Sequence, residues 1–157
     1  MNLEIERKFL VKNDSFKSKA FQKKQIKQGF LNSDKERTVR VRIIEDKAFL
    51  TIKGKSNNAG TIRFEWEKEI PLLEAEKLML LTEKTAIEKC RYYIKEGNRV
   101  FEVDEFFGAN SGLIIAEIEL TTEDESFSKP SWLGKEVTGE LKYYNSSLSK
   151  SPFCFWA

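Results

Sequence analysis

The chain has 157 residues, of which 40% are hydrophobic and 12% aromatic, and its formal net charge at pH 7 is +2. This length and composition predict a single globular domain, residues 1–157, and exclude a disordered chain. The small net charge gives no reason to expect nucleic acid or a membrane as a partner. The absence of histidine excludes histidine-based catalysis and histidine metal ligands.

Alternation of apolar and polar residues with period two predicts eight strands along the chain. In chain order they cover residues 3–11, 25–31, 38–44, 48–53, 61–70, 87–95, 99–107 and 113–121. Consecutive strands joined by short turns predict an antiparallel sheet that either curls or closes into a barrel. The alternation alone does not decide between these two forms.

Helical patterns are few, so the predicted fold is α+β but mostly β. A short helix is expected at 14–20 and a longer one at 71–81, with Pro71 at its start. Leu73, Leu80 and Leu81 are the apolar side chains expected on the face of this helix behind its acidic first turns. Residues 121–130 are polar and predict an exposed connection to a helical C-terminal segment from Ser131 onward.

The charged residues of the strands share faces. Glu4, Glu6 and Lys8 are spaced by two, so they point to one side of the first strand. Six further strands repeat the pattern, with the pairs Arg40/Arg42, Thr51/Lys53, Arg63/Glu65, Lys89/Arg91, Glu102/Asp104 and Glu117/Glu119. A charged face of an antiparallel sheet ordinarily meets water.

The alternative is a charged interior. An eight-stranded barrel has room for its own side chains or for one small ligand. Burying so many charges without a partner is unfavourable, so such an interior predicts a bound anion with cations. Carboxylates, the acidic ligands this sequence offers, favour a hard metal ion such as Mg²⁺, Mn²⁺ or Ca²⁺.

Several motifs resemble those of one known family in their order along the chain. They are Glu4-Ile5-Glu6-Arg7-Lys8 (ExExK), Gln28-Gly29-Phe30-Leu31, Arg40-Val41-Arg42, Thr51-Ile52-Lys53-Gly54, Arg63-Phe64-Glu65-Trp66-Glu67, Lys89-Cys90-Arg91-Tyr92, Glu102-Val103-Asp104, Glu117-Ile118-Glu119, and residues 132–138 with Tyr144-Asn145. Together they resemble the CYTH superfamily, also called triphosphate tunnel metalloenzymes. The resemblance spans almost the whole chain.

The resemblance implies an eight-stranded antiparallel closed β-barrel, a tunnel with a charged lumen and a few peripheral helices. It also implies a triphosphate substrate and a divalent cofactor, Mg²⁺ or Mn²⁺. Short bacterial members resembling this chain are often inorganic triphosphatases, which release pyrophosphate and phosphate from tripolyphosphate. Other members are class IV adenylyl cyclases or thiamine triphosphatases.

Residue roles follow from the same resemblance. The expected metal ligands are Glu4, Glu6, Glu117 and Glu119, with Glu67 and Asp104 as additional ones. The expected substrate-binding residues are Lys8, Arg40, Arg42, Lys53, Arg63, Lys89 and Arg91. Lys8, Glu117 and Glu119 are the expected catalytic residues, with the two glutamates orienting or deprotonating water. Lys142 stands where relatives carry arginine, which argues against a role of the C-terminal helix at the tunnel mouth.

Three functions remain open from the sequence: a metal-dependent triphosphate hydrolase, a cyclase, and a polyphosphate-binding module without turnover. The complete set of carboxylates favours the hydrolase over the binding module. The acidic start of the chain and two widely separated cysteines, Cys90 and Cys154, predict a cytoplasmic protein. A small-molecule triphosphate is the expected partner, and a homodimer is left open.

Overall fold

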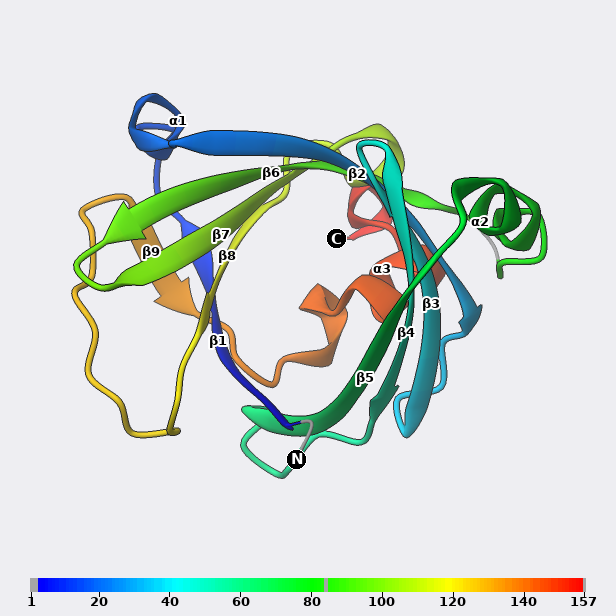
Figure 1. Cartoon of the computed structure of the whole chain (residues 1–157). Helices are drawn as coiled ribbons and strands as arrows, with labels where there is room; N and C mark the ends of the chain where they lie inside the picture. Colours follow the sequence, from blue (N-terminus) through cyan, green and yellow to red (C-terminus); the bar gives the residue numbers. More distant parts are fainter. Residues whose placement is uncertain (1–2, 84, 157) are drawn as a thin grey trace.

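In the computed structural model, which describes residues 3–83 and 85–156, antiparallel strands form one closed barrel. The strands are β1 (Leu3–Val11), β2 (Gln22–Asn32), β3 (Arg37–Ile44), β4 (Lys47–Gly54), β5 (Ile62–Ile70), β6 (Ile87–Glu96), β7 (Arg99–Phe106), β8 (Ile114–Glu119) and β9 (Leu133–Glu136). Their order in the sheet is β5-β4-β3-β2-β6-β7-β8-β1-β9, and an additional pairing of β5 with β1 closes the ring (Figure 1). The predicted eight-stranded antiparallel barrel is therefore confirmed.

The ring closes through a short seam along one edge of β1. Leu3–Ile5 of β1 pair with residues 62–64 of β5, and the amide of Glu6 donates to the carbonyl of Thr61 at 3.0 Å. Further along the same edge, the partner of β1 is β9. Lys8 lies where β1 passes from one partner to the other.

The extra strand β9 corrects one prediction. We expected helical structure from Ser131 onward, but residues 133–136 form a strand beside β1. The edge of β1 beyond its pairing with β5 carries backbone groups that need partners, and β9 supplies them. Gly134 permits this close approach, because a Cβ atom there would lie 2.8 Å from the carbonyl oxygen of Leu10. Helical structure begins later in the chain.

The helical elements are short. They are α1 (Phe16–Lys19), α2 (Leu72–Met79), α3 (Asn145–Lys150) and the 3₁₀ turns η1 (Gly108–Asn110), η2 (Leu141–Tyr143) and η3 (Phe153–Phe155). The helices α1 and α2 confirm the predictions for 14–20 and 71–81. In the described part of the chain, no helix combines the length and apolar character needed to cross a membrane.

The packing face of α2 differs from the prediction. The side chains expected to pack are exposed: Leu73 (73%), Leu80 (85%) and Leu81 (71%). The side chains that contact the sheet are instead Leu72, Ala75, Leu78 and Met79. These follow the three-to-four-residue spacing of a helix face. Leu80 and Leu81 instead lie beyond the end of the helix at Met79.

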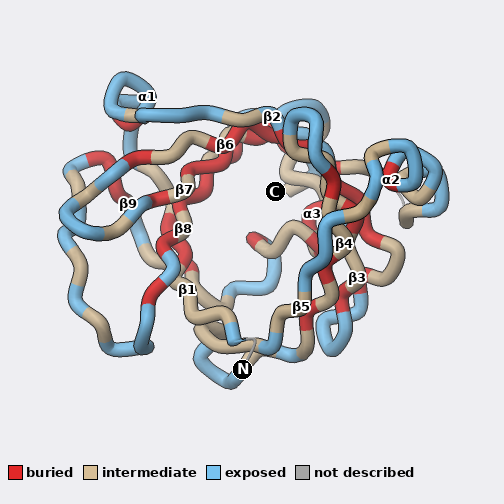
Figure 2. The backbone as a smooth tube through the Cα atoms, in the orientation of Figure 1, coloured by how far each residue is buried: buried red, intermediate tan, exposed pale blue. Residues whose placement is uncertain are grey.

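The main hydrophobic core lies outside the barrel. Phe101 and Ile118, on the outer faces of β7 and β8, pack with Phe16 of α1 and with Trp132 before β9. The ring of Trp132 is fully buried and contacts the rings of Phe16 and Phe101 at centroid distances of 5.9 and 5.3 Å. Buried backbone accordingly follows β6, β7 and β8, while α1 and the connecting loops are largely exposed (Figure 2).

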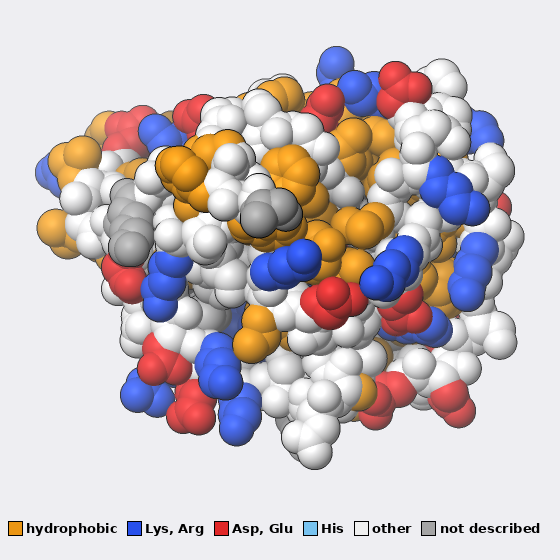
Figure 3. Space-filling view, turned by 180° about the vertical axis from the view of Figure 1, so that it is seen from behind, with side chains coloured by type: hydrophobic (Ala, Val, Ile, Leu, Met, Phe, Trp, Pro, Cys, Tyr) orange, Lys and Arg blue, Asp and Glu red, His pale blue; other side chains and the backbone are white. Residues whose placement is uncertain are grey.

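The inner face of the barrel becomes apolar toward one end. Ile87, Phe106 and Ile115 occupy inward positions, because each pairs across the sheet with an inward polar residue. They pack against Tyr143 and Leu148 of the C-terminal segment. In Figure 1, α3 lies within the outline of the ring. Viewed from behind, hydrophobic side chains gather near the middle of the molecule, with charged side chains around them (Figure 3). The C-terminal segment therefore fills the apolar end of the lumen.

Candidate active site

A cavity of about 240 Å³ lies within the barrel, and nearly all of its lining is polar or ionisable. The lining residues are Glu4, Glu6, Lys8, Phe30, Thr38, Arg40, Arg42, Thr51, Lys53, Arg63, Glu65, Glu67, Lys89, Arg91, Glu102, Glu117, Glu119, Tyr144, Asn145 and Ser146. Every site residue predicted from the sequence is present except Asp104. The alternation that put these charges on one face of each strand thus describes an enclosed face rather than a solvated one.

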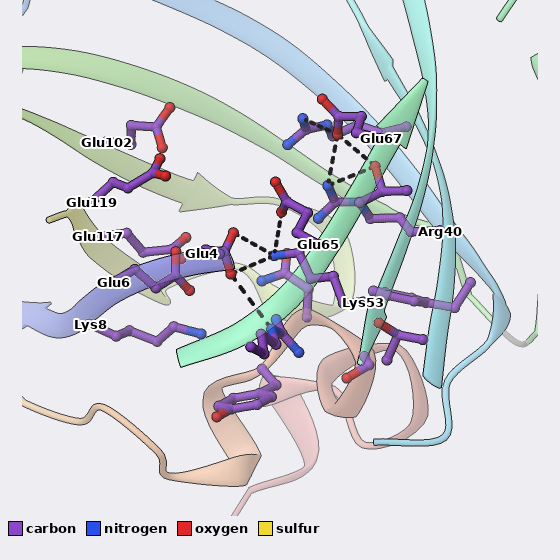
Figure 4. A pocket seen from close by; sticks show the side chains of 18 of the residues that line it. Glu4, Glu6, Lys8, Arg40, Lys53, Glu65, Glu67, Glu102, Glu117 and Glu119 are labelled. Atoms are coloured by element: carbon purple, nitrogen blue, oxygen red, sulfur yellow. Dashed lines mark hydrogen bonds and ion pairs between the residues drawn. The ribbon is translucent and has the colours of Figure 1, made fainter. Parts of the chain in front are cut away.

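Carboxylates concentrate where β1 lies beside β8. Glu6 is paired in register with Glu119, and Lys8 with Glu117. Glu102 of β7 is in turn opposite Glu117. Figure 4 shows these side chains together with Glu4 on one side of the cavity. Directly opposed like charges on neighbouring strands are destabilising unless a cation lies between them.

The pKa values in this acidic group diverge. Burial raises the pKa of Glu6 well above its ordinary value, and the negative charges of Glu117 and Glu4 raise it further. Burial also opposes ionisation of Glu117, but the charges of Lys8 and Arg91 outweigh it and lower that pKa. At Glu4, burial is outweighed mainly by Lys53, and the pKa falls to about 2.

Basic side chains occupy the facing wall. They come from β3 (Arg40, Arg42), β4 (Lys53), β5 (Arg63) and β6 (Lys89, Arg91). Several have a carboxylate partner: the ammonium of Lys53 lies 2.9 Å from Glu4 and 3.2 Å from Glu65. Arg63 joins the same charge network, since its Nε atom lies 3.6 Å from Glu4.

Arg40 and Arg42 are two buried cations that share one nearby carboxylate, that of Glu67. Burial lowers the pKa of Arg40 to about 9, and the charge of Arg42 contributes to this shift. The pKa of Arg42 is lowered by burial and then by Arg91. In the described part of the chain, the Nε atoms of both arginines are buried without a hydrogen-bond partner. Buried donors without acceptors are costly, so this wall is suited to an anion.

Glu67 lies with these arginines and not with the acidic group. Its carboxylate is 3.2 Å from Arg42 and 3.7 Å from Arg40, and it accepts a 2.6 Å hydrogen bond from the Thr51 hydroxyl. Figure 4 shows Glu67 across the cavity from Glu6 and Glu117. This position fits a residue that orients the arginines.

Asp104 is the predicted site residue that the cavity does not expose. It is 1% exposed and accepts two hydrogen bonds from Arg91, at 2.7 and 2.9 Å. The ammonium of Lys89 lies 2.8 Å from the same carboxylate. Both oxygens of the Asp104 carboxylate contact these two cations. Asp104 therefore fixes the side chains of Arg91 and Lys89 without lining the cavity itself.

The sequence analysis missed the contribution of the C-terminal segment. Tyr144, Asn145 and Ser146 line the cavity, so the expectation drawn from Lys142 is corrected: the start of α3 does reach the site. Period-two alternation could not find these residues because they belong to no strand. The Tyr144-Asn145 pair was visible only as part of the family resemblance.

The donor set fits a divalent cation of the hard class. Among residues 3–83 and 85–156, no three acidic or thiol side chains already converge into a ready-made metal cage. Mg²⁺ is usually held by one or two carboxylates together with substrate phosphates and water, so a complete protein cage is not required. Burial, and then the negative charges of Glu117 and Glu4, raise the pKa of Glu6, and a bound cation would offset that negative charge.

Comparison with known proteins places this geometry in a family. The model of the CYTH domain matches residues 2–152. An inorganic triphosphatase from Acetivibrio thermocellus is 48% identical over 154 residues, covering 98% of this chain and 97% of the relative. An inorganic triphosphatase from Nitrosomonas europaea is 35% identical over 152 residues, covering 94% and 97%.

A solved structure agrees with these sequence relatives. The crystal structure of an inorganic triphosphatase superposes with a TM-score of 0.67 at 34% identity, covering 94% of this chain and 98% of that one. The match of the family model over nearly the whole length, together with these relatives, shows that the chain belongs to the CYTH domain family.

Proposed function

We propose that this protein is a divalent-metal-dependent hydrolase that converts inorganic tripolyphosphate to pyrophosphate and phosphate. The observation that carries the proposal is the division of one enclosed cavity into an acidic wall and a basic wall with unpaired buried donors. Relatives that are inorganic triphosphatases and match nearly end to end support it.

The basic residues would bind the phosphate chain. Guanidinium groups suit bidentate contact with phosphate oxygens, whereas lysines act as compact charges. We assign phosphate contact to Lys8, Arg40, Arg42, Lys53, Arg63, Lys89 and Arg91. Of these, Lys53 and Arg63 also contact Glu4, so they link the phosphate site to the acidic wall.

The acidic residues would hold the metal. We assign Mg²⁺ or Mn²⁺ to Glu4, Glu6, Glu117 and Glu119. The register of β1 and β8 brings the last three together, and Glu4 is two residues before Glu6 on the same face of β1. We leave Asp104 out of this set because it does not line the cavity. Glu67 is left out because it lies across the cavity from Glu6 and Glu117, beside Arg40 and Arg42. Bound metal would offset charge on the phosphate oxygens and on the leaving pyrophosphate.

The proposed reaction is attack of water in line on a terminal phosphorus. A bond forms between the water oxygen and that phosphorus, and the bond to the bridging oxygen breaks. The bridging oxygen leaves with pyrophosphate. We assign orientation of the water and acceptance of its proton to the Glu117 and Glu119 pair, and charge stabilisation of the transferred group to Lys8.

Three alternatives are weighed against the same site: a cyclase, a thiamine triphosphatase and a polyphosphate-binding module. A class IV-type cyclase needs a place for a nucleoside, but among the described residues the lining offers only Phe30 and Tyr144 as aromatic side chains. Thiamine triphosphate would likewise need room for its organic part. A polyphosphate-binding module needs the basic wall alone, and the opposed carboxylates of β1 and β8 would then be a cost without a use.

The test is a product assay. The protein is incubated with tripolyphosphate, ATP or thiamine triphosphate, each with Mg²⁺ or Mn²⁺, and phosphate, pyrophosphate and cyclic AMP are measured. We expect phosphate and pyrophosphate from tripolyphosphate. Glu6→Gln should reduce this activity by about 100-fold or more, because it removes a proposed metal ligand.

Glu88→Gln is the matched control. It is the same change of glutamate to glutamine, made at an exposed position on the outer face of β6. It should retain wild-type activity. Cyclic AMP from ATP without phosphate from tripolyphosphate would replace the hydrolase by the cyclase. Tight binding of tripolyphosphate without any product would identify the protein as a polyphosphate-binding module instead.

A further inference from the structure

Two consecutive residues of the C-terminal segment contact basic side chains from different strands. The ring of Tyr144 has the Lys8 ammonium of β1 4.5 Å from its centroid and the Arg63 guanidinium of β5 at 5.4 Å. The Oδ1 atom of Asn145 accepts hydrogen bonds from Lys89 of β6, at 2.9 Å, and from Gln28 of β2, at 2.7 Å. Three of the cations assigned to phosphate therefore touch this pair.

The Lys8 side chain depends on the Tyr144–Asn145 pair more than the Arg63 and Lys89 side chains do. Its side chain is buried, with a residue exposure of 6%. Within residues 3–83 and 85–156, no ion pair within 4 Å is formed by its ammonium, unlike those of Lys53 and Lys89. A cation over an aromatic face is attracted by the ring, and more strongly where water is excluded. The charges of Glu117 and Glu6 act on the Lys8 ammonium from the acidic wall, and the Tyr144 ring is its direct contact on the other side of the seam.

The Tyr144 ring has little freedom to move. The Tyr144 carbonyl accepts hydrogen bonds from the amides of Ser147 and Leu148, both at 2.9 Å, and Leu148 is fully buried in the apolar end of the barrel. The phenol oxygen lies 3.4 Å from the Ser56 hydroxyl, in the loop between β4 and β5. The face of the ring, and not its hydroxyl, is therefore the part that meets the two cations.

The packing of two glycines holds the same region together. Gly60 and Gly139 have φ angles of 76° and 81°, and a Cβ atom on Gly60 would lie 2.3 Å from the Cα atom of Gly139. The loop before β5 and the turn after β9 therefore meet at van der Waals distance next to Tyr144. This contact lies at the seam where β1 changes its partner.

We propose that Tyr144 is a positioning residue of the phosphate site, whose ring fixes Lys8 and Arg63 at the seam between β1 and β5. Asn145 extends the same support to Lys89. The C-terminal segment would thereby complete the binding site in addition to closing the apolar end of the barrel. The inference rests on the proposed function, because it assumes that these cations meet a phosphate chain.

The test compares Tyr144→Leu, Tyr144→Phe and Tyr143→Leu. Tyr143 is a matched control: it is buried in the same segment and meets the Trp156 ring edge to face at a centroid distance of 5.4 Å, but it does not line the cavity. Binding of tripolyphosphate is measured by calorimetry in EDTA, which needs no turnover, and melting temperatures are recorded for each variant. Steady-state kinetics with Mg²⁺ follow separately.

Tyr144→Leu should raise Kd and KM for tripolyphosphate about tenfold, a loss expected from two desolvated cation–π contacts. Tyr144→Phe keeps the ring and should restore most of the affinity. Tyr143→Leu should lower the melting temperature without weakening binding. In a Lys8→Gln background, the effect of Tyr144→Leu should shrink to about threefold, since only the contact with Arg63 remains.

Wild-type affinity in Tyr144→Leu would overturn the proposal. So would an equal loss in Tyr144→Phe, which would assign the effect to the hydroxyl, or an undiminished tenfold effect in the Lys8→Gln background. Failure of the proposed function looks different: the wild-type protein would then bind tripolyphosphate in the calorimeter and release no phosphate, or would not bind it at all.

Discussion

At the scale of single residues, the site holds charges that the protein alone does not balance. Arg40 and Arg42 are buried beside each other, and the pKa values of both are lowered by burial. Glu6 is the acidic counterpart, with a pKa raised by burial and by Glu117. Such groups lower the stability of the empty protein, and a bound ligand would supply the partners that the Nε atoms of both arginines lack.

Arg40→Gln tests this trade between stability and binding. It should raise the KM for tripolyphosphate by about tenfold or more through loss of a charge-assisted contact, while raising the melting temperature without ligand by about 1–3 °C. Kinetics and thermal melts in EDTA measure the two effects. Arg37→Gln, at an exposed position of the same strand, should change neither quantity; a lower melting temperature in Arg40→Gln would contradict the account.

Asp104 and Glu6 should respond in opposite ways to neutral substitution. Asp104→Asn leaves Arg91 and Lys89 buried without their carboxylate, which should cost about 3–5 kcal/mol of unfolding free energy. Glu6→Gln relieves repulsion with Glu117 and should stabilise the protein in EDTA. Denaturant unfolding in EDTA compares the two variants. Equal destabilisation by both would show that the two carboxylates have the same role.

The residue scale also shows what alternation can predict. In a closed barrel, alternate residues of a strand still point to the same side. The spacing of Glu4, Glu6 and Lys8 was therefore enough to assign them to one wall. Alternation could not separate Asp104 from Glu102, although only Glu102 lines the cavity. That difference arises because Arg91 on the neighbouring strand covers Asp104. The sequence of one strand does not determine its register with the next, so this pairing could not be predicted.

At the scale of elements, β9 matters because it holds β1 beside Lys8. The amide of Lys8 donates to the Thr138 hydroxyl at 2.9 Å, and the Val137 amide donates to the Lys8 carbonyl at 2.8 Å. Arg7 donates two hydrogen bonds to Glu136, at 2.9 and 2.6 Å. The strand and the turn after it thereby continue the closure that β5 begins.

The pair of Arg7 and Glu136 predicts a pH dependence of stability. The hydrogen bond from Arg7 lowers the pKa of Glu136, so the unfolded chain binds the proton more readily than the folded one. The contribution is therefore present above the unfolded carboxyl pKa, near 4.3, and is lost as pH falls through the lower folded value. Glu136→Gln should destabilise by at most about 1 kcal/mol at pH 7, because the pair is partly exposed, and by less at pH 3.

Urea unfolding of both proteins at pH 7, 5 and 3 measures that difference. Glu36→Gln serves as the control, since the carboxylate of Glu36 is exposed and its cations lie 3.9 Å away. A difference between wild type and Glu136→Gln that grows toward pH 3 would contradict the sign of the pKa shift.

The elements themselves were predictable to different degrees. The eight barrel strands have strong alternation, and each appears within three residues of its predicted start. The four residues of β9 have too short a pattern, and they are extended because the edge of β1 needs a partner. The packing face of α2 was missed because it depends on where the helix ends, and Leu80 and Leu81 fall after that point.

At the scale of the whole molecule, the main apolar core is outside the barrel, and the charged cavity lies inside it beside a smaller apolar cluster at one end. This inversion makes ligand binding a large contributor to stability. Tripolyphosphate in EDTA, at about 100 times its Kd, should add about 2.7 kcal/mol of unfolding free energy and raise the melting temperature by about 5–10 °C. Sodium chloride at equal ionic strength is the control, and an equal rise with it would indicate screening instead of a specific site.

The central claim is hydrolysis of tripolyphosphate at a terminal phosphorus within this cavity, and product analysis in ¹⁸O-labelled water tests it most directly. Attack at the terminal phosphorus predicts equal amounts of phosphate and pyrophosphate, with the label in phosphate alone. Label in pyrophosphate would place the attack at the central phosphorus. No product above a metal-only blank would contradict the assignment as a hydrolase.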